Sequence, residues 1–398
     1  MVTVGPWEYL GVINNNPRVV FGANQGIQLG ATQGVLANPD LHWEERVSSN
    51  IGFEASLLNN RITLTVDAYR NRSNDVLVRL PVAMYLGSRR AFSGNADPYI
   101  NAASIQNQGI EASVTYRNNN SPIKYDVSFN ATTIKNEVLD VGNQGAGINY
   151  IQTGLTRSQV GQPVCQWYLI NALGLFQSQA EIDAYKNKDN IIIQPNAKPG
   201  DVKYEDVNGD GRITADDRQF VGSPWPKLQT GAQFNASYKG ITFNLQLVGI
   251  FGYQLYSDVY RILESGQTSN FLKSHSPWTP NNTDTDDPRL GIGADVGGVG
   301  ADLGIADNVR GGSSRWLSDA GYVRVRNLEI GYQLPQGLIN RAHLTNARIY
   351  VSGQNLLTFT KYVGTDPDAT GAGILDRGFD NGNWPAARIV SIGLNVDF

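Results

Sequence analysis

The sequence predicts an all-β protein made of antiparallel strands of a transmembrane β-barrel. Apolar and polar residues alternate along many segments, which is the period of a strand with two different faces. Only 17% of the 398 residues are charged, whereas 18 are tyrosine and 7 are tryptophan. No stretch reads as a membrane-spanning helix, because the best candidate, residues 240–256, itself alternates. A secreted β-rich protein shares this composition, so composition alone leaves the two classes close.

Alternation is strictest in the last segment, residues 388–398. An apolar residue stands at every even position from Val390 to Phe398, and small or polar residues stand between them. The segment ends on an aromatic residue. It is predicted to be a strand with one apolar and one polar face.

The same pattern returns through most of the chain. Residues 1–45 are rich in Gly, Asn and Pro and are predicted to be a mostly loop segment of a partial barrel, with barrel strands from 46 to 398. Clear strands are predicted at 47–57, 62–69, 110–116, 123–131, 232–238, 241–251, 322–334, 347–351 and 388–398. Short turns such as Asn59-Asn60 predict antiparallel hairpins. With less regular segments included, we expect about ten to twelve strands.

Charges fall almost wholly on one face of these strands. In a barrel, the apolar face meets lipid and the charged face lines the lumen. The side chains predicted to face lipid are Ile51, Phe53, Val127, Phe129, Leu245 and Leu394. Those predicted to face inward are Glu54, Asp67, Asp126 and Asn395.

Long loops are predicted between the strands. They lie at 81–105, with Ser88-Arg89-Arg90 exposed, at 257–320, and at 362–385. Ser178 and Glu181 resemble a capping box that opens a short helix through Lys188.

The acidic loop, residues 200–217, holds the most specific local motif. Oxygen-bearing side chains stand at positions 1, 3 and 5, glycine at position 6 and a carboxylate at position 12, as in a calcium-binding loop. The expected ligands are Asp206, Asn208, Asp210, Arg212 through its carbonyl, Thr214 and Asp217. The alternative is an Asp/Asn/Gly turn satisfied by its own backbone. The motif also resembles half of a dockerin module, but a second copy is absent.

Signals for other functions are poor. A net charge of −4 provides no basic field for nucleic acid. Cys165, the only cysteine, excludes an internal disulfide and is predicted to be a buried small hydrophobe. His42, His275 and His343 lie far apart and are predicted to be surface or loop residues. No catalytic residue is predicted, and we expect no enzyme.

Several motifs together resemble the C-terminal part of SusC/RagA-type TonB-dependent outer-membrane transporters. They are Asn38–Glu44, Ile105–Glu111, Gly200–Gly211, Gly222–Lys227, Tyr322–Leu328, Ser352–Leu357, Asp366–Asp368 and the closing aromatic residue. This resemblance is specific, because separate motifs agree in order.

The resemblance implies the C-terminal half, roughly, of a barrel that usually has twenty-two strands. It implies import of glycans or peptides across the outer membrane, a SusD-like surface lipoprotein as partner, and energy supplied by TonB. A signal peptide, TonB box, plug and first barrel half are expected to be missing from this chain. The family's substrate-binding residues are scattered, so none is assigned.

A secreted calcium-containing, carbohydrate-binding β-protein is the rival interpretation. A lectin would cluster aromatic residues in loops, where they stack on sugar rings, whereas a barrel places them near strand ends on its apolar face. Tyr116, Tyr125, Tyr238 and Phe398 are predicted to lie at such ends, which favours the barrel.

Overall fold

The fold is organised around one antiparallel sheet of eleven strands. A computed structural model describes residues 9–14, 18–21, 26–79, 99–142, 149–265, 270–290, 312–341, 344–369 and 377–397. The main path of the sheet is β5 (Glu45–Leu57), β6 (Ile62–Arg79), β7 (Tyr99–Asn118), β8 (Lys124–Thr133), β16 (Leu228–Tyr238), β17 (Ile241–Phe251), β20 (Tyr322–Gln333), β21 (Asn346–Gln354) and β24 (Ile389–Asp397). Two shorter strands, β9 (Lys135–Asp140) and β22 (Thr358–Thr360), pair with β7 and β20.

The register of the sheet aligns apolar residues with apolar residues across the whole path. One row runs through Leu57, Ile62, Tyr116, Val127, Phe234, Leu245, Leu328, Gly353 and Val390. The adjacent row, on the other face, runs through Ser56, Thr63, Thr115, Ser128, Gln233, Gln246, Asn327 and Gln354. The predicted separation of an apolar and a polar face is therefore confirmed.

The apolar face is open to the surroundings. Ile51 and Ile392 are each 77% exposed, and Phe53 and Leu394 are more than half exposed. Tyr116 and Tyr125 meet near the turn between β7 and β8 with ring centroids 5.9 Å apart. Large apolar side chains that no other layer covers are typical of a lipid-facing barrel wall. Phe398 lies outside the described residues.

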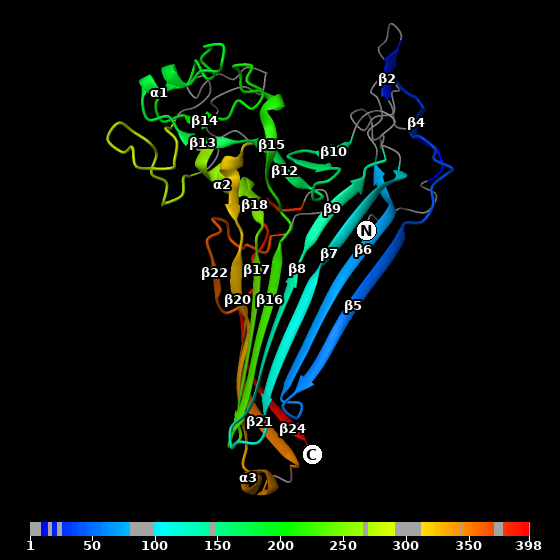
Figure 1. The fold of residues 1–398 in the computed structure, drawn as a ribbon, viewed down its shortest axis with the longest axis vertical. Coiled ribbons are helices and arrows are strands. Elements are labelled where there is room, and N and C mark those ends of the chain that lie inside the picture. The colour runs from blue at the N-terminus through cyan, green and yellow to red at the C-terminus, as the bar shows by residue number, and fades with distance from the viewer. Residues whose placement is uncertain are drawn as a thin grey trace.

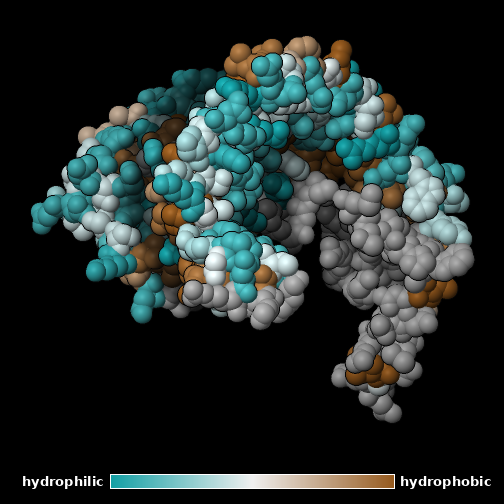
Figure 2. Space-filling model, turned by 90° about the horizontal axis from the view of Figure 1, so that it is seen from below, coloured by the Kyte–Doolittle hydropathy of each residue, from teal (hydrophilic) through white to brown (hydrophobic). Residues whose placement is uncertain are grey.

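The sheet is an open arc in the part of the chain that the structure describes. Strands β5 and β24 are its two edges and do not pair with each other. Figure 1 shows the strands fanning out between a loop-rich end, with α1 and α2, and a narrow end with α3 and the C-terminus. Seen from the narrow end, the molecule is curved and hollowed on one side (Figure 2). The eleven strands agree with the expected number.

The loop-rich end contains its own small sheets and cores. The strands there are β10 (Tyr150–Thr153), β11 (Thr156–Gln159), β12 (Gln166–Ile170), β13 (Ala172–Leu175), β14 (Val202–Tyr204), β15 (Arg218–Gly222), β18 (Gln254–Ser257), β19 (Leu317–Asp319) and β23 (Phe379–Asp380). The helices in the described residues are α1 (Gln179–Ala184), η3 (Ala215–Asp217), α2 (Asp258–Ser265), η5 (Ser314–Trp316) and α3 (Gln336–Arg341). Trp167, Leu169, Tyr256 and Trp316 form one of the buried clusters that hold this end together. None of the described helices is long and apolar enough to cross a membrane.

Some expected boundaries differ from the observed ones. The segment expected to be mostly loop contains four short strands, β1 (Val12–Asn14), β2 (Arg18–Phe21), β3 (Gly26–Leu29) and β4 (Thr32–Val35). Strand β7 begins at Tyr99, inside the expected loop at 81–105, because its polar first half pairs with β6 and β9. Helix α1 ends at Ala184 rather than Lys188, because Tyr185 leaves the helical conformation. The expected loop at 257–320 contains α2, η5 and β19. Ser88-Arg89-Arg90 lie outside the described residues.

Candidate functional site

The polar face of the sheet carries a hydrogen-bonded network of charged and amide side chains. Arg348 on β21 donates to Glu329 on β20 at 2.6 Å and to the Thr242 hydroxyl on β17 at 2.9 Å. Asn235 on β16 donates to the Asp126 carboxylate on β8 at 2.8 Å. This face is polar and charged, like the wall of a water-filled passage.

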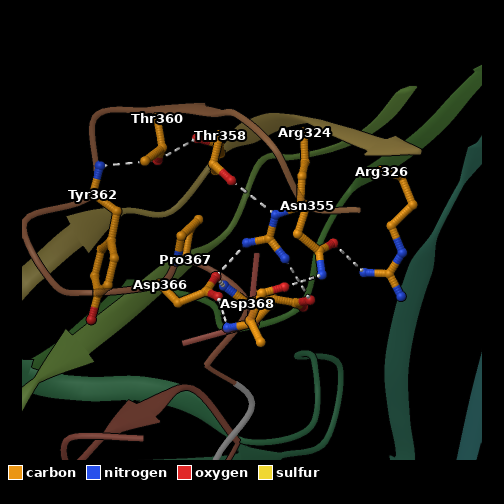
Figure 3. Close-up of polar contacts among 12 residues, drawn as sticks. Arg324, Arg326, Asn355, Thr358, Thr360, Tyr362, Asp366, Pro367 and Asp368 are labelled. Carbon is orange, nitrogen blue, oxygen red and sulfur yellow. Dashed lines mark hydrogen bonds and ion pairs between the residues drawn. The ribbon is translucent and has the colours of Figure 1, made fainter. Parts of the chain in front are cut away.

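A second network ties the last long loop to this face (Figure 3). Arg324 on β20 donates from Nε to the Thr358 hydroxyl at 3.0 Å, and its Nη2 pairs with Asp366. Its Nη1 lies 3.6 Å from the Asp368 carboxylate. The Arg324 side chain is only 3% exposed. A buried guanidinium needs such partners, because an unpaired buried charge is very costly.

The electrostatics of Asp366 follow from these contacts. Burial pushes the pKa of Asp366 upward, but backbone N–H groups of Ala386 and Asp368 and the Arg324 guanidinium outweigh burial, so the net pKa is lowered. The Ala386 amide donates to Oδ2 at 2.8 Å and the Asp368 amide to Oδ1 at 3.0 Å. The carboxylate therefore stays ionised and holds the Asp366–Asp368 motif on β20.

A cleft of about 910 Å³ opens at the junction between the sheet and the loop-rich end. Its walls carry the amides of Asn136, Gln162, Gln166 and Gln254 and the rings of Trp225 and Tyr253. Charged side chains at the cleft are Lys135, Glu137, Lys227 and Asp319. Aromatic rings beside hydrogen-bonding amides suit an oligomeric polar ligand, because the rings offer flat apolar area and the amides fix orientation.

The acidic loop forms a compact turn around its own carboxylates. Asp206 accepts the Gly209 amide at 2.7 Å and the Gly211 amide at 2.9 Å. Asp217, which is fully buried, accepts the amides of Thr214 at 2.6 Å and Val207 at 3.0 Å. These contacts are the ones expected for an Asp-rich turn satisfied by its backbone.

The other expected calcium ligands are arranged along the exposed rim of the loop. The Asn208 side-chain oxygen accepts the Asp210 amide, and the Asp210 carboxylate accepts the Arg212 amide at 2.8 Å. The Thr214 hydroxyl caps η3 by accepting the Asp216 amide. In the described residues, the ligand atoms of Asp206, Asp210 and Asp217 do not all lie within 4.8 Å of one another. Calcium binding at this loop stays a prediction.

The start of the acidic loop is fixed by a buried junction with the segment 270–290. Gly200 has φ +89° and its Cα lies so close to Trp278 that an added Cβ would meet the indole at 2.5 Å. Asp201, fully buried, pairs with Arg289 and accepts the Lys198 amide at 2.8 Å. Trp278 in turn donates from its indole nitrogen to Gln177 at 2.8 Å. The glycine of this motif is therefore required by both conformation and space.

His275 lies in a loop, one of the two predicted settings for the histidines, but not at the surface. Its side chain is only 4% exposed and lies beside Glu264 and Asp287. His42 is exposed, as predicted, with Nε2 3.6 Å from Asp75, and His343 lies outside the described residues. The sequence offers no signal for the buried cluster, since its members are 11 and 12 residues apart. Cys165 is fully buried, as expected.

The family model for TonB dependent receptor-like β-barrels matches residues 14–356. The chain belongs to this family. It is 29% identical over 389 residues to TonB-dependent receptor P26 of Formosa agariphila. The alignment covers 93% of the chain and 36% of that relative. It is 24% identical over 373 residues to TonB-dependent receptor SusC of Bacteroides thetaiotaomicron, covering 91% of the chain and 32% of SusC.

Solved structures give the same fold. The RagAB peptide transporter superposes with a TM-score of 0.75 at 22% identity, covering 99% of the chain and 39% of that structure. The receptor chain thus spans little more than a third of the length of the relatives it matches. TonB-dependent receptor β-barrels of this type are outer-membrane proteins. The exposed apolar face of the sheet is the one suited to lipid contact. These relatives are named as receptors and transporters, not as enzymes.

Proposed function

We propose that this receptor chain forms part of the wall and outer loops of an outer-membrane importer for oligomeric nutrients, glycans or peptides. The observation that carries the proposal is the sheet itself, with an apolar face for lipid and a continuous polar face behind it. We further propose that the chain takes part in transport alone and catalyses no reaction.

The cleft beside Trp225 and Tyr253 is the proposed contact for substrate. The cleft lies where the loop-rich end meets the sheet. If the loop-rich end faces the outside of the cell, as proposed, an entering molecule would reach the cleft before the polar face of the sheet. Trp225 is oriented by its indole N–H, which donates to the Val164 carbonyl at 2.7 Å, and by Arg377 over its ring. Such a fixed ring suits stacking on a sugar or an apolar peptide side chain.

The proposed partners follow from the family. A SusD-like surface lipoprotein would meet the loop-rich end and deliver substrate, and TonB would supply energy from the other side of the membrane. We also propose that the acidic loop binds Ca²⁺ weakly and is stiffened by it, with no part in chemistry.

Uptake in cells tests the proposal. The chain would be joined to the N-terminal segments of a SusC-type relative and expressed in an outer membrane with TonB. Accumulation of fluorescent oligosaccharides and oligopeptides would be measured with and without a protonophore. We expect energy-dependent uptake of one class, reduced about tenfold or more by Trp225→Ala. Trp384→Ala is the matched control, because Trp384 is 97% exposed and should leave uptake unchanged.

Uptake that persists without energy would contradict the proposal. Equal uptake by both tryptophan variants, at equal surface amounts of receptor, would contradict the role of the cleft. The choice between oligosaccharide and oligopeptide is itself decided by which probe accumulates.

A further inference from the structure

Three ionisable side chains converge inside the loop-rich end, and none of them lines the cleft or belongs to the acidic loop. Glu264 lies in the last turn of α2, and His275 and Asp287 belong to the segment 270–290. His275 Nδ1 lies 2.7 Å from Glu264 Oε2 and 3.4 Å from Asp287 Oδ2. Among the described residues, this is the only group of three or more His, Cys, Asp or Glu side chains whose ligand atoms all lie within 4.8 Å of one another.

The cluster is buried, and its Glu264 and His275 atoms have no hydrogen-bond partner. The Glu264 and His275 side chains are 3% and 4% exposed. Glu264 Oε2 and both ring nitrogens of His275 lack a hydrogen bond of acceptable geometry. The His275 ring is held flat against Phe271, with centroids 4.6 Å apart and an interplanar angle of 3°. Buried polar atoms without partners in a native protein call for an explanation, and a bound ion is one.

The geometry points to a cation between these three atoms. Zinc binds histidine nitrogen and carboxylate oxygen at about 2.0–2.2 Å, so tetrahedral ligand atoms are about 3.4 Å apart. The 3.4 Å contact from His275 Nδ1 to Asp287 matches that spacing, whereas the 2.7 Å contact to Glu264 is shorter and would have to lengthen when an ion binds. A simple ion pair with a charged imidazole would instead place an N–H in line with Glu264 Oε2, and that alignment is not met.

We propose that Glu264, His275 and Asp287 bind a divalent transition-metal ion of the zinc class. An imidazole with two carboxylates favours such an ion over Ca²⁺ or Mg²⁺, which prefer oxygen ligands alone. Arg315 approaches Asp287 at Oδ1, at 3.7 Å. The oxygen facing His275, Oδ2, accepts the Ser276 amide at 2.8 Å and keeps a second lone pair for a metal. Three protein ligands leave a fourth position for water.

The proposed ion would clip α2 to the segment 270–290. That segment is already joined to the acidic loop, because the Arg289 amide donates to the Gly200 carbonyl at 2.9 Å and Arg289 pairs with Asp201. A metal at Glu264 would therefore fix three parts of the outer loops as one unit, on the side of the receptor that meets its surroundings.

Zinc titration tests the site. The full chain, purified from outer membranes in detergent and stripped with a chelator, would be titrated calorimetrically with Zn²⁺ in excess Ca²⁺. We expect one Zn²⁺ per chain, with affinity at least tenfold weaker in His275→Ala and in Glu264→Gln. His42→Ala is the matched control, because His42 also faces an aspartate but its side chain is 57% exposed. It should bind Zn²⁺ as the unmodified chain does.

Zinc-edge X-ray absorption on the unmodified chain provides a test that does not depend on folding of the variants. We expect nitrogen and oxygen neighbours only, including one imidazole. The proposal would be overturned by no zinc binding, by displacement of zinc by Ca²⁺, or by a zinc shell without imidazole. Affinity in both cluster variants equal to that of the unmodified chain would overturn it as well. The three side chains would then be an ion-pair cluster without metal.

Discussion

The guanidinium of Arg324 on β20 and the carboxylate of Asp366 in the last long loop form a buried ion pair between residues 42 positions apart. The pair joins the most regular part of the molecule, the sheet, to one of its least regular parts. Tyr253 supports the same loop by donating from its hydroxyl to the Pro367 carbonyl at 2.7 Å. The loop therefore lies against the end of the sheet instead of extending into solvent.

Replacing Arg324 with Met should destabilise the receptor by about 3–5 kcal/mol, because Asp366 would remain as a partly buried charge without its partner. The neighbouring Arg326→Met should change stability by less than about 1 kcal/mol. Arg326 is exposed and makes only a 3.3 Å hydrogen bond to Asn355. Unfolding of both variants in detergent, followed by heat-modifiable migration, measures the difference. Equal loss in the two variants would contradict the role given to the ion pair.

The same pair predicts a pH dependence. The pKa of Asp366 is below its ordinary value of 3.8, because hydrogen bonds from Ala386 and Asp368 and the Arg324 charge outweigh the effect of burial. A lowered pKa stabilises the fold above the ordinary value, and this contribution is lost as pH falls through the lowered pKa. The stability difference between the unmodified chain and Asp366→Asn should be constant near neutral pH and shrink in strong acid. A difference that grows on acidification would show the opposite sign of linkage.

Alanine substitutions at Gly200 and Gly209 distinguish the cost of an unfavourable backbone conformation from the cost of a steric clash. Both have positive φ, +89° and +75°, but only Gly200 is pressed against another residue, Trp278. Gly209→Ala should cost about 1–2 kcal/mol, the usual penalty for alanine in this conformation. Gly200→Ala should cost more and expose the segment 270–290 to protease, because the indole must move. Similar protease cleavage of the two variants would mean that the junction at Trp278 does not hold the segment.

The acidic loop should bind Ca²⁺ with a dissociation constant on the order of 10⁻⁴–10⁻³ M, the range of extracellular modules. Asp210→Ala should abolish the calorimetric signal. Asp216→Ala is the control, because Asp216 is exposed and stands at a position that supplies no expected ligand. A calcium signal unchanged by Asp210→Ala would sink the assignment and leave a turn held by its own backbone.

Much of the sheet can be predicted from the sequence because its signal is local. Alternation places Val127 and Phe129 on one face without any knowledge of their neighbours, and Asn59 and Asn60 take the positive φ values of a tight turn. The strands of the loop-rich end lack this signal. Gln166 of β12 (Gln166–Ile170) is followed by four aromatic or aliphatic residues in succession, so the sequence of this strand does not alternate.

The sites depend on contacts that no local pattern encodes. Arg324 and Asp366 meet only because β20 and the last loop are brought together, and Glu264, His275 and Asp287 meet only because α2 packs on a later segment. The acidic loop is the reverse case, since its motif is local and its compact turn follows from it. Whether that turn also holds an ion depends on the arrangement of its oxygens, which the motif alone does not fix.

The central claim is that the sheet is a membrane wall with lipid on one face and water on the other, and adjacent spin labels on β8 test it most directly. Labels at Phe129 and Ser128 would be compared in the full chain in lipid vesicles, with oxygen as the lipid-soluble relaxant and a nickel chelate as the water-soluble one. Phe129 lies in the apolar row beside Val114 and Ala232, and Ser128 lies in the polar row beside Thr115 and Gln233. We predict that oxygen relaxes the label at 129 more strongly and nickel the label at 128. Equal accessibility at the two positions would contradict the account.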